Sequence, residues 1–185
     1  IYKKISQKLR TYQWEKNPLG EGKNIAISFE HIKRAAYKCL KLLSFYAFVN
    51  GEKGIINGLT IKEACQKIVI EYNQKLEEAS MISSFFKKDF SLLQLSEEKL
   101  LHFVIKSGFL NESQKGDSIE NSTFEFIHLS FQEYLAASYI SKLRIDEVNW
   151  VLNKYSSLKY WGEIFVFLSE ILAKHNMANY YFDWF

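Results

Sequence analysis

The residues best placed to do chemistry lie in one stretch of sixteen, Phe124 to Tyr139, which reads FEFIHLSFQEYLAASY. Phe124, Phe126 and His128 alternate along the first part of this stretch. Alternate side chains of a β-strand point to the same face, so the spacing predicts a strand that presents the three rings together. The imidazole of His128 then lies where the strand ends.

A helix is predicted directly after His128. Ser130 and Glu133 form the S-x-x-E pattern of a capping box, which predicts a helix that begins at about Phe131. The N–H groups of a first helical turn have no helical partner, and the helix dipole there favours negative charge. His128 is therefore placed to meet an anion, although the spacing alone also fits the commoner case of a histidine hydrogen-bonded to a nearby carbonyl. A core-facing stripe follows at Phe131, Leu135 and Tyr139.

The other histidines and the two cysteines do not suggest a metal site. His31, His102 and His175 lie singly on predicted helices, without a convincing second ligand at i+3 or i+4. Cys39 and Cys65 fall inside apolar helical patterns, which favours buried free thiols over a disulfide or a metal pair. We therefore expect no metal centre.

No catalytic arrangement is found in the sequence either. The nearest approach to a phosphate-binding P-loop is Gly20-Glu-Gly-Lys-Asn24, which ends in Asn instead of Ser or Thr and has Asn17 at the upstream glycine position. The sequence also lacks an acidic Walker B run and a G-x-S-x-G motif. Asp89, Glu97 and Glu98 have no acid–base partner in the pattern. We expect that this chain alone is not an enzyme and has no catalytic residues.

The composition is that of an ordinary globular protein, with 48% hydrophobic and 24% charged residues and a net charge of +3. This small charge neither requires nor excludes an anionic partner. The sequence contains no secretory signal and no apolar run of membrane-spanning length, so we expect a cytoplasmic protein without a membrane partner. The missing initial Met and the apolar tail Tyr180–Phe185 lead us to expect a piece of a longer protein.

The elements that position His128 are predicted to be mostly helical. Apolar side chains at helical spacing predict a first helix over residues 1–14, a last one over Tyr160–Ala173, and helices that follow caps at Ser28, Thr60, Ser96 and Asp146. Asn50-Gly51 and Gly108 are expected to end two of them, and Gly51–Gly58 is expected to be a loop. Phe109-Leu110 and Thr123–Ile127 predict a two-stranded hairpin around a polar loop. Residues 81–95 fit no single period.

The run Ile127 to Ala137 closely resembles the F-x-F-x-H-L-S-F-Q-E-[FY]-L-A-A signature of NACHT-type signalling NTPases, the group that includes the NOD-like immune receptors. In that family the signature lies near the end of a winged-helix domain. Three further segments look like family landmarks in the family's order: Ile1–Trp14 like the last helix of the first helical domain, Ser107–Leu110 like the segment before the wing, and Tyr160–Leu168 like the helical domain after it. The resemblance spans nearly the whole chain.

This resemblance implies a mainly α fold, in which a winged-helix domain with a small two-stranded β wing occupies residues 28–143. Before it lie the last helix of a first helical domain, residues 1–17, and a linker, residues 18–27. After it comes the start of a second helical domain, residues 144–185. The family's signature histidine approaches the phosphates of bound ADP, which gives His128 the role of a phosphate sensor.

The resemblance also implies partners and cofactors. ADP or ATP with Mg²⁺ would be held by the NTPase core of the same polypeptide, and this chain alone would bind none of them. The module would close over ADP in the resting state. In the active state the module itself would be released, and the parent protein would assemble into a homo-oligomer.

Two other function classes fit the sequence less well. A winged-helix DNA-binding regulator needs a basic recognition helix and a basic wing. Here the helix before the wing opens with Ser96-Glu-Glu-Lys99, and the wing loop carries Glu112, Asp117 and Glu120 against Lys115. An independent helical protein-interaction domain would explain the helices but not the signature. We expect no specific nucleic-acid partner.

Overall fold

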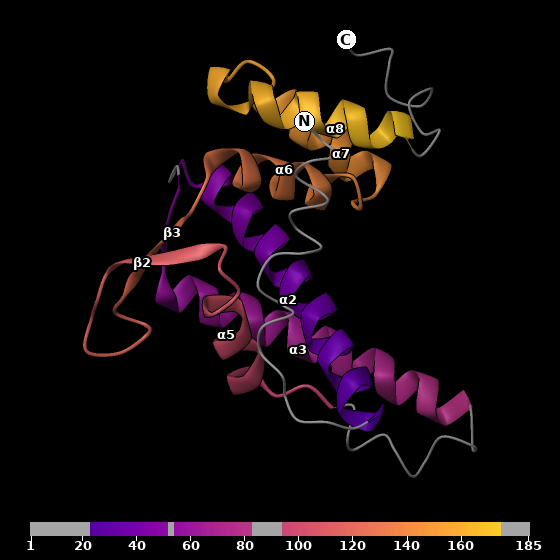
Figure 1. Cartoon of the computed structure of the whole chain (residues 1–185). Helices are drawn as coiled ribbons and strands as arrows, with labels where there is room; N and C mark the ends of the chain where they lie inside the picture. The colour runs from indigo at the N-terminus through magenta and orange to yellow at the C-terminus, as the bar shows by residue number, and fades with distance from the viewer. Residues whose placement is uncertain (1–22, 52–53, 83–93, 175–185) are drawn as a thin grey trace.

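A computed structural model describes residues 23–51, 54–82 and 94–174, which form helices with one small sheet at their side (Figure 1). The helices are α2 (Lys23–Val49), α3 (Gly58–Ile82), α5 (Glu97–Ile105), α6 (Leu129–Ile140), α7 (Ile145–Tyr155) and α8 (Gly162–Lys174), with a short 3-10 helix, η3 (Lys159–Trp161), before α8. The strands are β1 (Ile55–Asn57), β2 (Leu110–Gln114) and β3 (Thr123–Phe126). The predicted mainly helical fold is confirmed at this level.

The long helix α2 runs through the molecule and contacts two groups of helices, one that contains α3 and α5 and one that contains α6 (Figure 1). Helices α3 and α5 pack against it on one side of the structure, and α6 packs against it near its C-terminal end. Helix α8 lies over α6, and the β2–β3 hairpin extends to the side. His128 lies between the end of β3 and the start of α6, where the sheet meets this second group of helices.

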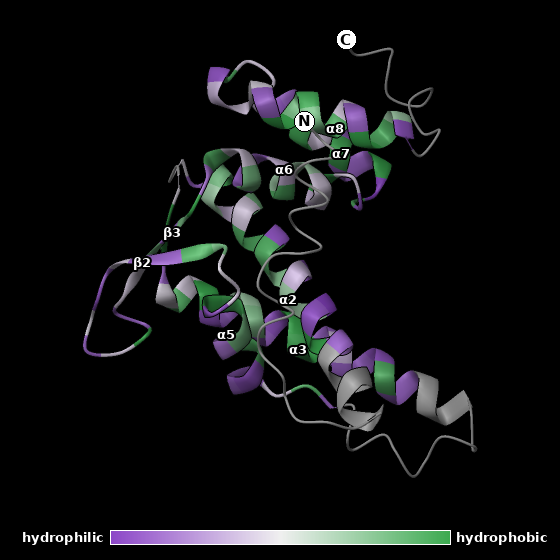
Figure 2. Cartoon of the chain, in the orientation of Figure 1, coloured by the Kyte–Doolittle hydropathy of each residue, from purple (hydrophilic) through white to green (hydrophobic). Residues whose placement is uncertain are grey.

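Helix α2 buries one apolar face, on which Ile32, Ala36, Leu40 and Leu43 recur at helical spacing. Green, apolar segments recur on the helices, while the β2–β3 loop is mostly purple and polar (Figure 2). Trp161 is fully buried. Its ring stacks on Tyr155 at a centroid distance of 4.2 Å and meets Phe48 edge-on at 5.9 Å.

The two cysteines are buried free thiols, as predicted. Cys39 Sγ and Cys65 Sγ lie 3.6 Å apart, where α2 packs against α3. The hydrogen bond with Cys65 and burial of the thiol both raise the pKa of Cys39 well above its ordinary value. Since the thiolate is the reactive form, the raised pKa makes Cys39 a poor nucleophile.

The sheet has three strands instead of the predicted two. The predicted hairpin is present, with Leu110 opposite Phe126 in the β2–β3 ladder. The segment expected to be a loop adds β1, which pairs antiparallel with the other side of β3 and places Ile56 opposite Phe124. Three residues are too few to show an alternating strand pattern in the sequence. The strand is recognised in the structure, because it pairs with the edge of β3 that β2 leaves free.

The loop between β2 and β3 is fixed to the start of α3. Gly58 N–H donates to the Ser122 carbonyl at 2.8 Å, and Lys62 Nζ donates to Glu120 Oε1 at 2.7 Å. The hydrogen bond from Lys62 is the main cause that lowers the pKa of Glu120 to about 2. These contacts hold the acidic loop against α3.

The predicted start of α5 is confirmed, and the last predicted helix begins within one residue of its expected start. Ser96 caps α5, since its Oγ accepts from Lys99 N–H at 3.3 Å. The predicted helix over Tyr160–Ala173 is present as η3 and α8. The predicted ends also hold: α2 stops at Val49 before Gly51, and Gly108 takes a positive φ of 78° after α5.

Of the caps predicted at Ser28, Thr60, Ser96 and Asp146, all but Ser96 are wrong. Helix α2 starts at Lys23, so Ser28 lies inside it and the helix includes residues 23–27 of the predicted linker. Nothing between Lys23 and Ser28 breaks a helix, which explains the earlier start. Helix α3 starts at Gly58, because Asn57 Oδ1 accepts from Thr60 N–H at 2.7 Å and takes the capping role predicted for Thr60.

Helix α7 begins at Ile145, with Arg144 at the N-cap in place of the predicted Asp146. Arg144 N–H donates to Glu147 Oε2 at 2.8 Å, while the Asp146 carboxylate accepts from the Arg144 guanidinium. The Asp146 carboxylate is therefore paired with a side chain and does not cap the backbone N–H groups of α7.

Within the described residues, no helix is long and apolar enough to cross a membrane. The predictions for residues 1–17, 83–93, His175 and the tail 180–185 fall outside the described part of the chain.

Candidate functional site

The predicted strand-to-helix joint is present at His128. Strand β3 ends at Phe126, and α6 begins at Leu129. His128 is the N-cap, with extended backbone angles of φ −147° and ψ 131°. Its carbonyl accepts from Phe131 N–H at 3.1 Å and Gln132 N–H at 3.3 Å, so the first helical turn closes on His128 itself.

The capping box predicted for Ser130 is therefore wrong. Ser130 already belongs to α6, two residues after the N-cap. His128 has the extended backbone that an N-cap needs, and this moves the helix start from the predicted Phe131 to Leu129.

The side chain of His128 points away from the core, unlike the two phenylalanines before it. Phe124 and Phe126 are buried, whereas His128 is exposed. The strand ends before His128, so the strand alternation does not place the imidazole on the buried face that Phe124 and Phe126 share. Its ring meets Phe131 edge-on at a centroid distance of 5.2 Å. Its nitrogens have no hydrogen-bond partner among the described residues, and its side chain does not cap α6.

The surroundings of His128 are suited to an external negative charge. The first turn of α6 contains no acidic residue, and both Leu129 and Ser130 are exposed. The positive end of the helix dipole and the first N–H groups of α6 therefore have no carboxylate from that turn beside them. The geometry brings one imidazole and one helix start together, and among the residues that the structure describes around His128 there is no glycine-rich cradle for a whole phosphate chain.

Gln132 is a buried polar residue that the sequence patterns did not single out. It lies one turn after His128 on α6, and its side chain is fully buried. Neither Nε2 nor Oε1 has a hydrogen-bond partner in the described part of the chain. A buried amide without partners is costly, so this position is unusual. Its spacing from Leu135 and Ala136, both fully buried, could have placed it on the inner face.

The other candidate histidines with described positions lie on two different helices, α2 and α5. His31 Nδ1 and Tyr72 OH are 2.6 Å apart and form a hydrogen bond between α2 and α3. His102 is exposed in the last turn of α5. Across the residues described, no group of three His, Cys, Asp or Glu side chains is arranged to hold a metal ion.

Comparison with known proteins found no matching family model, no similar curated protein and no similar solved structure. The likeness to NACHT-type NTPases therefore depends on the motif residues.

Proposed function

We propose that the chain is the regulatory winged-helix and helical module of a NACHT-type nucleotide-switch NTPase that acts in immune or antiphage signalling. One observation carries the proposal: the signature segment forms a strand, an exposed histidine and a helix in immediate succession. The hairpin β2–β3 after helix α5 supplies the wing of this assignment, and α7 and α8 supply the start of the second helical domain.

In the proposed resting state, this module closes over ADP that the NTPase core of the same polypeptide holds with Mg²⁺. His128 donates a hydrogen bond to a phosphate oxygen, and the start of α6 adds its dipole. His128 fits one phosphate contact but not a nucleotide cradle, which needs a ring of backbone N–H groups and a lysine. ATP or a sensed ligand would release the module, and the open protein would form a homo-oligomer.

The gene that encodes the chain tests this assignment directly. A G-x-x-x-x-G-K-[ST] motif that follows a predicted strand is expected upstream in the same reading frame. A complete reading frame without such a motif would contradict the proposal and leave an independent helical interaction domain as the better description.

For the chain alone, we predict no ATPase activity and a dissociation constant for ADP or ATP no tighter than about 1 mM. The reason is the missing phosphate cradle, since one imidazole cannot replace it. Calorimetry with Mg²⁺ and each nucleotide measures the constant. A micromolar value would mean that the chain has a nucleotide site that this assignment does not provide.

We also predict at most weak DNA binding without sequence preference. Helix α5 opens with Glu97 and Glu98, and the wing loop holds Asp117 and Glu120, so negative charge lies where a DNA reader needs lysine or arginine. A mobility-shift assay near physiological salt with a pool of random duplexes is the measurement. Selection of one tight-binding sequence from the pool would favour the transcription-factor function.

A further inference from the structure

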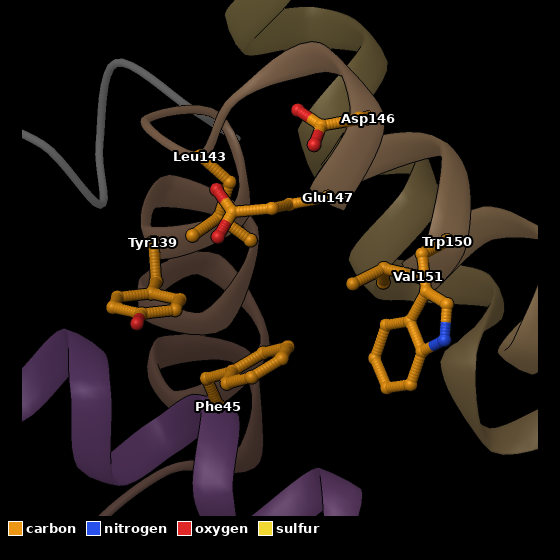
Figure 3. A pocket seen from close by; sticks show the side chains of 7 residues that line it. All are labelled: Phe45, Tyr139, Leu143, Asp146, Glu147, Trp150 and Val151. Atoms are coloured by element: carbon orange, nitrogen blue, oxygen red, sulfur yellow. The ribbon is translucent and has the colours of Figure 1, made fainter.

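A cavity of about 430 Å³ lies away from His128, between the ends of α2 and α6 and the start of α7. Three aromatic side chains, two aliphatic ones and two carboxylates line it: Phe45, Tyr139, Trp150, Leu143, Val151, Asp146 and Glu147 (Figure 3). Its volume is in the range of sites that take small organic molecules. The mixture of aromatic rings and acids indicates the kind of molecule.

The aromatic side chains leave ring surface open to the cavity. Phe45 and Tyr139 stack on each other with centroids 4.9 Å apart. Trp150 stands across from them in Figure 3, and 53% of its surface is exposed. Outside the cavity lining, Lys154 Nζ already lies 4.6 Å from the centre of the Trp150 ring. This ring thus accepts a cation over its face within the protein.

The two carboxylates differ in whether an oxygen remains that accepts no hydrogen bond from the protein. Both oxygens of Asp146 accept from the Arg144 guanidinium, at 3.1 and 2.9 Å. Glu147 uses Oε2 to accept from Arg144 N–H, and Oε1 has no hydrogen-bond partner among the described residues. In Figure 3 the Glu147 carboxylate lies between α6 and α7, above the Tyr139 ring and beside Leu143. Glu147 therefore keeps one charged acceptor for a ligand.

The charges around the cavity are mixed but favour a cation inside it. Burial is the largest cause that raises the pKa of Tyr139, and Glu147 adds to it while Lys67 opposes it. Lys67 donates to Tyr46 OH at 3.3 Å. Neither Lys67 nor Arg144 lines the cavity, whereas both carboxylates do.

We propose that this cavity binds a small organic cation with N–H donors, a guanidinium or primary ammonium group on a short aliphatic stem. The charged head would lie against the rings of Trp150 and Tyr139 and donate to Glu147 Oε1, and the stem would contact Leu143 and Val151. The site is separate from His128, and it does not depend on the nucleotide switch.

The test compares n-butylguanidinium with n-butylurea, a neutral molecule of nearly the same shape. Titration of the chain, followed by NMR at the Trp150 indole N–H, is expected to give a dissociation constant of about 1 mM or tighter for the cation. The urea is expected to bind at least about 10-fold more weakly, because it lacks the charge. Equal binding of the two molecules, or no shift with the cation, would overturn the proposal.

Two variants assign the contacts. Glu147→Gln keeps an oxygen that accepts from Arg144 N–H but removes the negative charge. Trp150→Leu removes an exposed aromatic ring. Each substitution should weaken butylguanidinium binding roughly 3- to 30-fold. Binding to Trp150→Leu is followed by calorimetry. Glu163→Gln is the matched control, because Glu163 is also an exposed acid in a first helical turn but lies outside the cavity lining. If all three variants bind alike while their melting curves match that of the parent chain, the cation binds elsewhere.

Discussion

In the proposed nucleotide-switch protein, replacing His128 with alanine is expected to shift the equilibrium towards the open, signalling state by about 10- to 150-fold. A hydrogen bond to a charged group contributes about 1.5–3 kcal/mol net. In the proposed mechanism the bond to phosphate exists only in the closed state, so its loss changes the closed-to-open ratio by the corresponding factor. Basal signalling output and the rate of ADP release are the measurements.

The same substitution should leave the fold of this chain nearly unchanged. The His128 side chain is exposed, its backbone carbonyl still closes the first turn of α6, and the substitution removes only an edge contact with Phe131. We expect a melting temperature within about 2 °C of the parent chain. His102→Ala is the control, since His102 is also an exposed histidine on a helix, and it should change neither quantity.

The opposite result is equally distinct. If His128 serves only the fold, its removal lowers the melting temperature by several degrees and leaves signalling unchanged or reduced. A clear loss of stability without a gain in basal activity or ADP release would falsify the phosphate-sensing role.

The parts of the fold that the sequence predicts well are those decided within a few residues. The Ser96 cap, the stop at Gly108 and the β2–β3 hairpin each depend on neighbours in the chain or across one short loop. The joint at His128 belongs to the same group, because a strand pattern and a helix pattern meet there without a linker.

The parts that sequence misses depend on competition or on distant contacts. Asn57 and Thr60 can both cap a helix, and the choice falls to Asn57 because β1 holds it next to β3. The cavity could not be read from the sequence, since it joins Phe45 to residues about a hundred positions later. Gln132 is similar: its motif position was visible, but its burial without a hydrogen-bond partner appears only in three dimensions.

The second large effect is expected at Gly58, the first residue of α3. Gly58 is buried, and its N–H donates to the Ser122 carbonyl at 2.8 Å. A Cβ at this position would collide with the carbonyl oxygen of Ile119, which belongs to the backbone of the β2–β3 loop. Because a backbone atom cannot rotate away as a side chain can, the loop or the helix start has to move.

Gly58→Ala should therefore lower the free energy of unfolding by about 2–3 kcal/mol, which corresponds to a fall of roughly 4–12 °C in melting temperature. Gly162→Ala is the matched control at the first residue of another helix. Its backbone is right-handed, with φ −53° and ψ −50°, and an added Cβ meets nothing within 4 Å. This control should keep or gain stability, by up to about 1 kcal/mol, because alanine restricts the unfolded chain. Thermal unfolding followed by circular dichroism measures both melting temperatures. If the two variants melt at the same temperature, the close packing of the β2–β3 loop on α3 is wrong.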